Sequence, residues 1–219
     1  MENSEKYYIL KPAVDSDETG KAYPAAESYD DYDFKAPNSV HNLNFREFPD
    51  FEPDIRFKLA KGAKLTDMLS QAAINANGFL VNHKLKKVIE KTNTVPCKFF
   101  KAKIEFKGGI ADYYWMHLVW PDGINFVKFP NTNFNITEFG TVIEPISINS
   151  YEDLGEKQKQ LGVIKMIYAE QIVMREPNYD IWPNPINIGI FVNEKTRHLI
   201  ESVNPSGVSF EVNNSVLFG

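Results

Sequence analysis

The four histidines are the side chains best suited to chemistry, but their spacing does not build a site. His41, His83, His117 and His198 are far apart, and none has a second His, a Cys or a paired carboxylate at a metal-ligand spacing. The chain also lacks a glycine-rich phosphate loop and a G-x-S-x-G nucleophile motif. We therefore expect no cofactor, no metal and no enzymatic activity.

Cys97 is the only cysteine, so the chain cannot form an internal disulfide or a zinc site made of thiolates alone. As a nucleophile it would need a base that the fold brings to it, because no His is close in sequence. A single free thiol fits a reducing compartment. The first residues contain no apolar signal core, and no later run has the length of a membrane helix. We expect a cytoplasmic protein that is not held in a membrane.

Residues 15–33 hold seven acidic side chains against one lysine, with aromatic residues between them and no helical period. Such a composition is typical of a solvated loop, and we expect residues 15–40 to form an irregular acidic surface segment. The alternative is an acidic and aromatic contact surface for a basic partner. The candidate partner-binding residues are Tyr29, Asp30, Asp31, Tyr32, Asp33 and Phe34.

Residues 84–107 have the opposite charge, with eight lysines against Glu90 and Glu105, a net of +6. These lysines are either ordinary solvated side chains or a positive surface. Beside Tyr113, Tyr114 and Trp115, such a surface could bind single-stranded nucleic acid. The net charge of the whole chain, -5, argues against a dedicated nucleic-acid binder.

Two segments of the chain read as the same unit of strand, helix and strand. Shifting the sequence by 111 positions places residues 189–210 over 78–99 with eight identities in 22 positions. Asn82 and Asn193 stand where each helix begins, and asparagine is a favoured N-cap. The apolar residues after each Asn follow a helical spacing, so both helices should pack one face on a sheet. We predict repeated units at 78–106 and 189–212.

The other patterns favour a single α+β domain over residues 1–219, with an antiparallel or mixed sheet and a few short helices. Alternating residues predict strands near 7–10, 55–59 and 141–148, the last at an edge because of Pro145, and a hairpin from 100–106 to 113–120. We also expect a third meander strand at 124–129, a short helix from Leu65 to Ala73 and a helix from Glu152 to Leu161. Residues 163–174 fit strand or helix, with strand favoured.

Several of these stretches resemble a known family. They are the unit at 78–106, Tyr113-Tyr114-Trp115, Leu65-Thr66-Asp67, and the closing run from Ile190 to Lys195 with Gly207-Val208. Together they resemble the immunity-protein-11 family of bacterial polymorphic toxin systems. That family usually has Ser where Asn82 and Asn193 stand, and both residue types cap helices. The resemblance implies an α+β cytoplasmic protein that binds and neutralises a cognate toxin without catalysis, and it supplies no binding residues.

Overall fold

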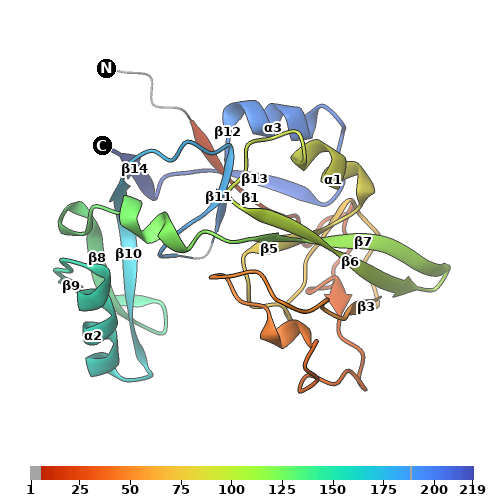
Figure 1. The fold of residues 1–219 in the computed structure, drawn as a ribbon, viewed down its shortest axis with the longest axis horizontal. Helices are drawn as coiled ribbons and strands as arrows, with labels where there is room; N and C mark the ends of the chain where they lie inside the picture. The colour runs from red at the N-terminus through yellow and green to blue at the C-terminus, as the bar shows by residue number, and fades with distance from the viewer. Residues whose placement is uncertain (1–5, 188) are drawn as a thin grey trace.

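The computed structural model describes residues 6–187 and 189–219, and in these ranges it has three sheets and three α-helices (Figure 1). The protein is an α+β fold, as the sequence predicts. No helix in the described ranges is both long and apolar enough to cross a membrane.

The largest sheet has six strands, and its centre is the predicted hairpin of β6 and β7. β3 is parallel to β6, and the other pairings are antiparallel. In spatial order the strands are β2 (Ala26–Glu27), β3 (Ile55–Leu59), β6 (Cys97–Phe106), β7 (Gly109–Leu118), β5 (Gly78–Val81) and β4 (Met68–Leu69).

The second sheet repeats the order of four of the six strands of the first. Its strands are β11 (Ile181–Pro183), β12 (Ile190–Asn193), β1 (Tyr7–Pro12) and β13 (Val208–Val212). β1 lies antiparallel between β12 and β13, as β7 lies between β5 and β6. Val192 pairs with Tyr8, and its counterpart Val81 pairs with Tyr114. The second unit is therefore completed by a strand from the other end of the chain.

Both predicted units contain a strand, a helix and a second strand in that order. The helices are α1 (His83–Ile89) and α3 (Glu194–Glu201), which lie near each other above the two sheets (Figure 1). Leu85, Val88 and Ile89 of α1 and Ile200 of α3 are buried in one apolar core. That the two units superpose stays a prediction.

A third sheet forms a separate lobe at the lower left of Figure 1. Its strands in order are β14 (Val216–Phe218), β10 (Lys165–Met174), β8 (Asn133–Glu138) and β9 (Thr141–Ile146). The helix α2 (Tyr151–Leu161) lies against β10. The Gln158 side chain bonds the carbonyl of Lys165 and the amide of Ile167, at 2.9 and 2.8 Å, which fixes the helix to the start of β10.

The large sheet separates two cores. On one face Phe100, Ala102 and Trp115 pack with buried residues from the first sixty of the chain. On the other face Met116 and Leu118 join a larger core that runs through the second sheet and into β8 and β10. Alternation along β6 and β7 produces this division, because neighbouring side chains of a strand point to opposite faces.

Two sequence predictions are wrong. Leu65 to Ala73 is not a helix, because Met68 and Leu69 pair with β5 and Ser70 holds the backbone amides of Ala25 and Ala26. Residues 124–129 are not a strand: two short 3-10 helices, Pro121–Phe126 and Phe129–Asn131, occupy this stretch. A proline in the first turn of each favours a helical turn at that place.

Other predictions are confirmed. Residues 165–174 form a strand, and the helix 151–161 begins at Ser150, whose side chain accepts the amide of Asp153 at 3.1 Å. β9, with Pro145, is an edge strand. Residues 15–40 are largely irregular, as predicted. Their one strand is the two-residue β2, and most of the remainder consists of turns, bends and irregular backbone.

Candidate functional site

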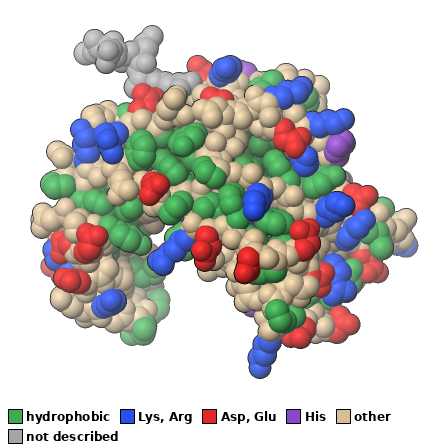
Figure 2. Space-filling model, in the orientation of Figure 1, with side chains coloured by type: hydrophobic (Ala, Val, Ile, Leu, Met, Phe, Trp, Pro, Cys, Tyr) green, Lys and Arg blue, Asp and Glu red, His purple; other side chains and the backbone are tan. Residues whose placement is uncertain are grey.

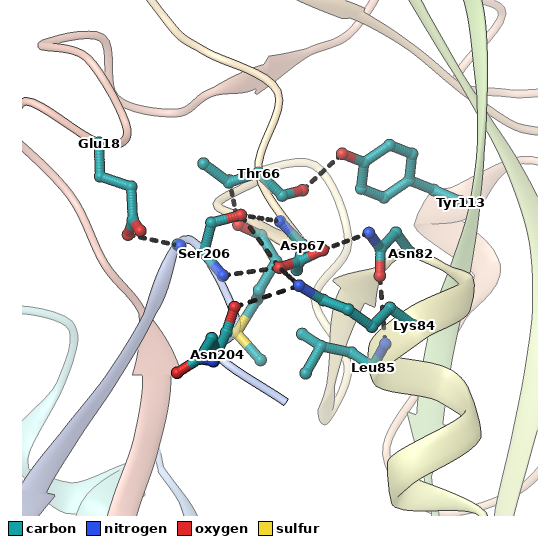
Figure 3. Close-up of polar contacts among 11 residues, drawn as sticks. Glu18, Thr66, Asp67, Asn82, Lys84, Leu85, Tyr113, Asn204 and Ser206 are labelled. Carbon is teal, nitrogen blue, oxygen red and sulfur yellow. Dashed lines mark hydrogen bonds and ion pairs between the residues drawn. The ribbon is translucent and has the colours of Figure 1, made fainter. Parts of the chain in front are cut away.

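A buried carboxylate, Asp67, lies where the two units meet, and it binds groups from both (Figure 3). Its Oδ1 accepts the Asn82 side-chain amide at 2.5 Å. Its Oδ2 accepts the backbone amide of Ser206 at 2.6 Å and the Ser206 hydroxyl at 3.1 Å. The Lys84 Nζ pairs with the same oxygen at 2.5 Å and also donates to the carbonyl of Asn204. We call these five residues the Asp67 junction.

The environment keeps Asp67 ionised at neutral pH. Burial on its own would raise the pKa of this carboxyl, but the hydrogen bonds from Lys84, Ser206 and Asn82 outweigh it, so the pKa is lower than usual. Both oxygens are held by groups of the protein itself. This arrangement suits a carboxylate that joins elements of the fold rather than one that takes a proton from a substrate.

Asn82 connects the junction to the helix α1. Its side-chain oxygen accepts the amide of Leu85 at 3.1 Å, so it is the predicted N-cap, while its amide nitrogen donates to Asp67. Its own backbone amide bonds the carbonyl of Asp67 at 2.8 Å. The start of the helix is therefore fixed to the residue that precedes β4.

The second unit has the same arrangement around Asp180. The Asn193 side chain accepts the amide of Thr196 at 2.9 Å and donates to the Oδ1 of Asp180 at 2.8 Å. The Oδ2 of Asp180 accepts the backbone amide of Asn93, which follows α1, at 2.8 Å. Ser206, which Asp67 holds, follows α3. Each aspartate therefore binds the capping residue of its own unit and the loop after the helix of the other unit.

Residues that carry the family resemblance meet at the Asp67 junction. The hydroxyl of Tyr113 donates to the carbonyl of Thr66 at 2.5 Å. Gly207 has a positive φ of 70°, and a Cβ there would lie 2.4 Å from the oxygen of Met68 and from the Thr66 hydroxyl. Only glycine fits such a position without moving the backbone. Sequence reasoning grouped these residues but missed Asp180.

The six candidate partner-binding residues do not share one environment. Asp30, Asp31, Asp33 and Phe34 are exposed, and Tyr29 is partly buried with its hydroxyl donating to Glu105 at 2.7 Å. Tyr32 belongs to the core: its hydroxyl bonds the carbonyl of Asp54 and the amide of Val40. Tyr32 therefore fixes the segment in place, while the carboxylates on either side of it lie at the surface.

Exposed acidic residues continue beyond that segment. Glu47, Asp50 and Glu52 are exposed as well. Residues 15–54 together hold eleven acidic and three basic side chains, so their net charge is −8. Several of these residues are paired within the segment or to β3, for example Asp30 with Lys58 at 3.1 Å.

The lysine-rich stretch 84–107 is divided by the fold. Lys84, Lys86 and Lys103 form ion pairs with Asp67, Glu90 and Asp112. Lys98 lies over the ring of Phe48 at 4.6 Å. Among the described residues, the lysines of this stretch with neither an ion pair nor a ring contact are Lys87, Lys91, Lys101 and Lys107.

His117 and Cys97 are structural in their surroundings. Trp115 donates to the Nδ1 of buried His117 at 3.3 Å, so the ring is the tautomer whose Nε2 donates to the carbonyl of Asn44 at 2.8 Å. Burial lowers the pKa of His117. Burial raises the pKa of the Cys97 thiol to about 12, which keeps it protonated and a poor nucleophile at neutral pH.

In the part of the chain that the structure describes, no three residues of the His, Cys, Asp and Glu types are grouped to hold a metal ion. Comparison of the chain with protein-family models and with curated proteins gives no match.

Proposed function

We propose that this protein binds and neutralises a protein toxin in the cytoplasm, without catalysing a reaction itself. The observation that carries the proposal is the convergence of the resemblance motifs on the Asp67 junction. Thr66, Asp67, Tyr113 and Gly207 come from three separate stretches and contact one another there or through shared neighbours. Motifs that meet at one place in the fold are better evidence of a common scaffold than motifs that scatter.

The same geometry separates the scaffold from the contact surface. Because the carboxylate of Asp67 is held by its neighbours, partner-binding residues belong on exposed surfaces elsewhere. The exposed carboxylates Asp30, Asp31 and Asp33 are our candidates, since a surface of one charge attracts an oppositely charged partner and raises its association rate. The partner is then a basic toxin.

The alternative function, a small enzyme or a nucleic-acid-binding protein that uses the lysine-rich face 84–107, has weaker support. Three of the eight lysines neutralise carboxylates of the protein itself.

The test has two stages. The first asks whether a gene beside this one encodes a protein with a toxin domain, and whether co-expression of this protein restores growth to cells that make the toxin. Failure to restore growth with a well-expressed toxin would contradict the proposed function.

The second stage measures association kinetics after replacing Asp30, Asp31 and Asp33 by Asn. We expect association with the toxin to slow by about tenfold or more at low salt, with a smaller difference at high salt. The matched control replaces Lys87, Lys91 and Lys101 by Gln, because these lysines form no ion pair that holds the fold. If association slows only in the lysine variant, the toxin contacts the lysine-rich face and not the acidic segment.

A further inference from the structure

The third lobe contains a polar pocket whose lining shares no residue with the Asp67 junction. It has a volume of about 540 Å³ and lies between the 3-10 helix Phe129–Asn131, the start of β8 and the segment that links β9 to α2. A volume of this order is typical of ligand pockets. We call it the Glu170 pocket, and the polar side chains of its lining belong to Thr132, Asn133, Asn135, Ser147, Asn149 and Glu170.

Asn135 is only 8% exposed, yet half of its side-chain amide has no partner. Its Nδ2 donates to the Oε2 of Glu170 at 2.8 Å. A carboxylate only accepts hydrogen bonds, so this contact fixes which end of the amide faces Glu170. The Oδ1 of Asn135 accepts no hydrogen bond from the described residues, although buried oxygens normally have a partner. It is not sealed off, because the fully buried side-chain atoms without a partner in the described ranges are limited to the Nε1 of Trp182. A group bound in the pocket would supply the missing donor.

Glu170 supplies the one charged side chain of the lining, and a backbone irregularity places it there. Its neighbours Ala169 and Gln171 pair with consecutive residues of β8, so Glu170 is the extra residue of a β-bulge. Bulges redirect a side chain and are common beside functional sites. Among the described residues Glu170 has no ion-pair partner, and its Oε1 accepts no hydrogen bond. The pocket therefore has two free acceptors, this oxygen and the Oδ1 of Asn135, on side chains that already bond each other.

The walls around these acceptors are fixed by hydrogen bonds of the protein itself. The Thr132 hydroxyl donates to the carbonyl of Lys128 and accepts the amide of Val173, both at 3.1 Å, which joins the 3-10 helix to β10. On the other side, Lys157 of α2 donates to the carbonyl of Ser147 at 2.7 Å. A wall that is ordered before binding lowers the entropy cost of holding a ligand.

The charges around the pocket leave that of Glu170 uncompensated. Lys157, the cation tied to the wall, is paired with Asp153 at 3.0 Å. Lys128 and Glu144 adjoin lining residues in the chain and carry opposite charges. On the face shown in Figure 2, acidic and basic side chains are intermixed over the third lobe. Recognition of a cation would therefore depend on the acceptors of the pocket and not on the field of a charged patch.

We propose that the Glu170 pocket binds the guanidinium group of an arginine side chain from another polypeptide. A guanidinium only donates hydrogen bonds and presents parallel N–H groups to a carboxylate, whereas an ammonium is a compact, strongly hydrated charge. Its flat faces suit the apolar part of the lining, which includes Pro130, Pro145 and Ile146. Pro130, Asn133 and Asn149 are exposed, so the pocket opens at the surface and admits a side chain whose backbone stays outside. The proposal stands apart from toxin neutralisation, because it requires only an arginine exposed on a partner.

The test titrates the full chain with the capped peptide acetyl-Gly-Arg-Gly-amide and with its citrulline and lysine counterparts. Citrulline has nearly the shape of arginine but no charge, and lysine keeps the charge without the planar fork. Binding is measured by calorimetry, and the contact is located by changes in backbone amide signals in nuclear magnetic resonance spectra. We expect the arginine peptide to bind about tenfold more tightly than either control. It should shift signals of residues 132–135, 145–149 and 169–171.

Glu170→Gln keeps the shape of the side chain and removes its charge, so it should weaken binding of the arginine peptide by about tenfold. Asn135→Ala removes the second acceptor and the bond that orients Glu170, and should weaken binding by about threefold or more. The control Glu144→Gln removes an exposed carboxylate of the same lobe that does not line the pocket, and should leave binding unchanged. Thermal unfolding of each variant verifies that it is folded.

Several results would overturn the proposal. The arginine peptide could leave these signals unchanged at millimolar concentration, either control peptide could bind as tightly, or Glu170→Gln could bind like the parent protein. Free L-arginine that binds more tightly than the peptide would assign the pocket to a small molecule, and calcium that displaces the peptide would assign it to a metal ion. None of these results bears on growth rescue by co-expression, so the Glu170 pocket and the neutralising activity fail separately.

Discussion

Asp67 is the residue on which most of the junction depends, because one carboxylate accepts from four donor atoms of Asn82, Lys84 and Ser206. Replacing Asp67 by Asn would remove the negative charge that Lys84 faces. It would also replace one carboxylate oxygen by an amide group that donates hydrogen bonds, although the neighbouring groups are donors too. We expect the free energy of unfolding to fall by about 2 kcal/mol or more, as for a largely buried pair that loses one partner. Urea unfolding at pH 7 measures the change.

The control is Asp112→Asn, which breaks the exposed ion pair with Lys103. Exposed pairs contribute less than about 1 kcal/mol, so this variant should unfold almost like the parent. The pKa of Asp67 is lowered in the folded protein, so its contribution is present above the usual Asp pKa and is lost as the pH falls through the folded value. If Asp67→Asn and Asp112→Asn lower the free energy of unfolding at pH 7 by the same amount, Asp67 has no special role in stability.

His117 gives a pH dependence in a higher range. Burial lowers its pKa, and the Lys98 charge adds to this, while the bond to Asn44 opposes it. As the pH falls, the unfolded chain takes up a proton on His117 near the usual histidine pKa of about 6.5, whereas the folded protein takes it up only at a lower pH. The free energy of unfolding should therefore decline as the pH falls from about 6.5. His117→Gln should flatten the decline between about pH 6.5 and 5 relative to the parent protein. A decline of the same size in both proteins would assign it to other groups.

At the scale of elements, the two capped helices make a matched pair. Asn82 and Asn193 each accept an amide of their helix and donate to an aspartate. Replacement by Ala should cost about 1 to 2 kcal/mol at either position, because a cap is lost and the aspartate loses a donor. Replacement by Ser keeps a capping oxygen and should cost less. Thermal unfolding of the four variants measures both effects, and an Ala substitution without cost at either site would contradict the shared role.

The capping residues were predictable from sequence, whereas their aspartate partners were not. Asn82 begins a helix that its own neighbours specify, and so does Ser150 at the start of α2. Asp67 and Asp180 lie 15 and 13 residues before their asparagines, across hairpins of different length. An alignment at one fixed offset cannot pair them.

The wrong assignment of residues 65–73 has a similar cause. Leu65, Met68 and Leu69 have helical spacing, but long-range bonds to Ser206 and to β5 determine their conformation. Local patterns are informative where the contacts are local, as in the β6 and β7 hairpin.

For the whole molecule, the position of β1 means that the first and last parts of the chain must assemble together. β1 is the central strand that joins β12 to β13, and Tyr7, Tyr8 and Leu10 are buried in the larger core. β7 has the same place in the first unit but follows β6 through a hairpin. The second unit therefore depends on a contact that spans nearly the whole sequence.

Deleting residues 1–12 should abolish cooperative folding of the second sheet, because β13 then has no partner strand and the strands β11 and β12 lose their central neighbour. Hydrogen exchange should show residues 190–212 unprotected in the deletion variant, and a synthetic peptide of residues 1–14 should restore protection when added. The control deletion of 214–219 removes only the edge strand β14, and β10 keeps its pairing with β8. Residues 190–212 should then remain protected. Full protection of those residues without β1 would show that the second unit folds from the C-terminal quarter of the chain alone.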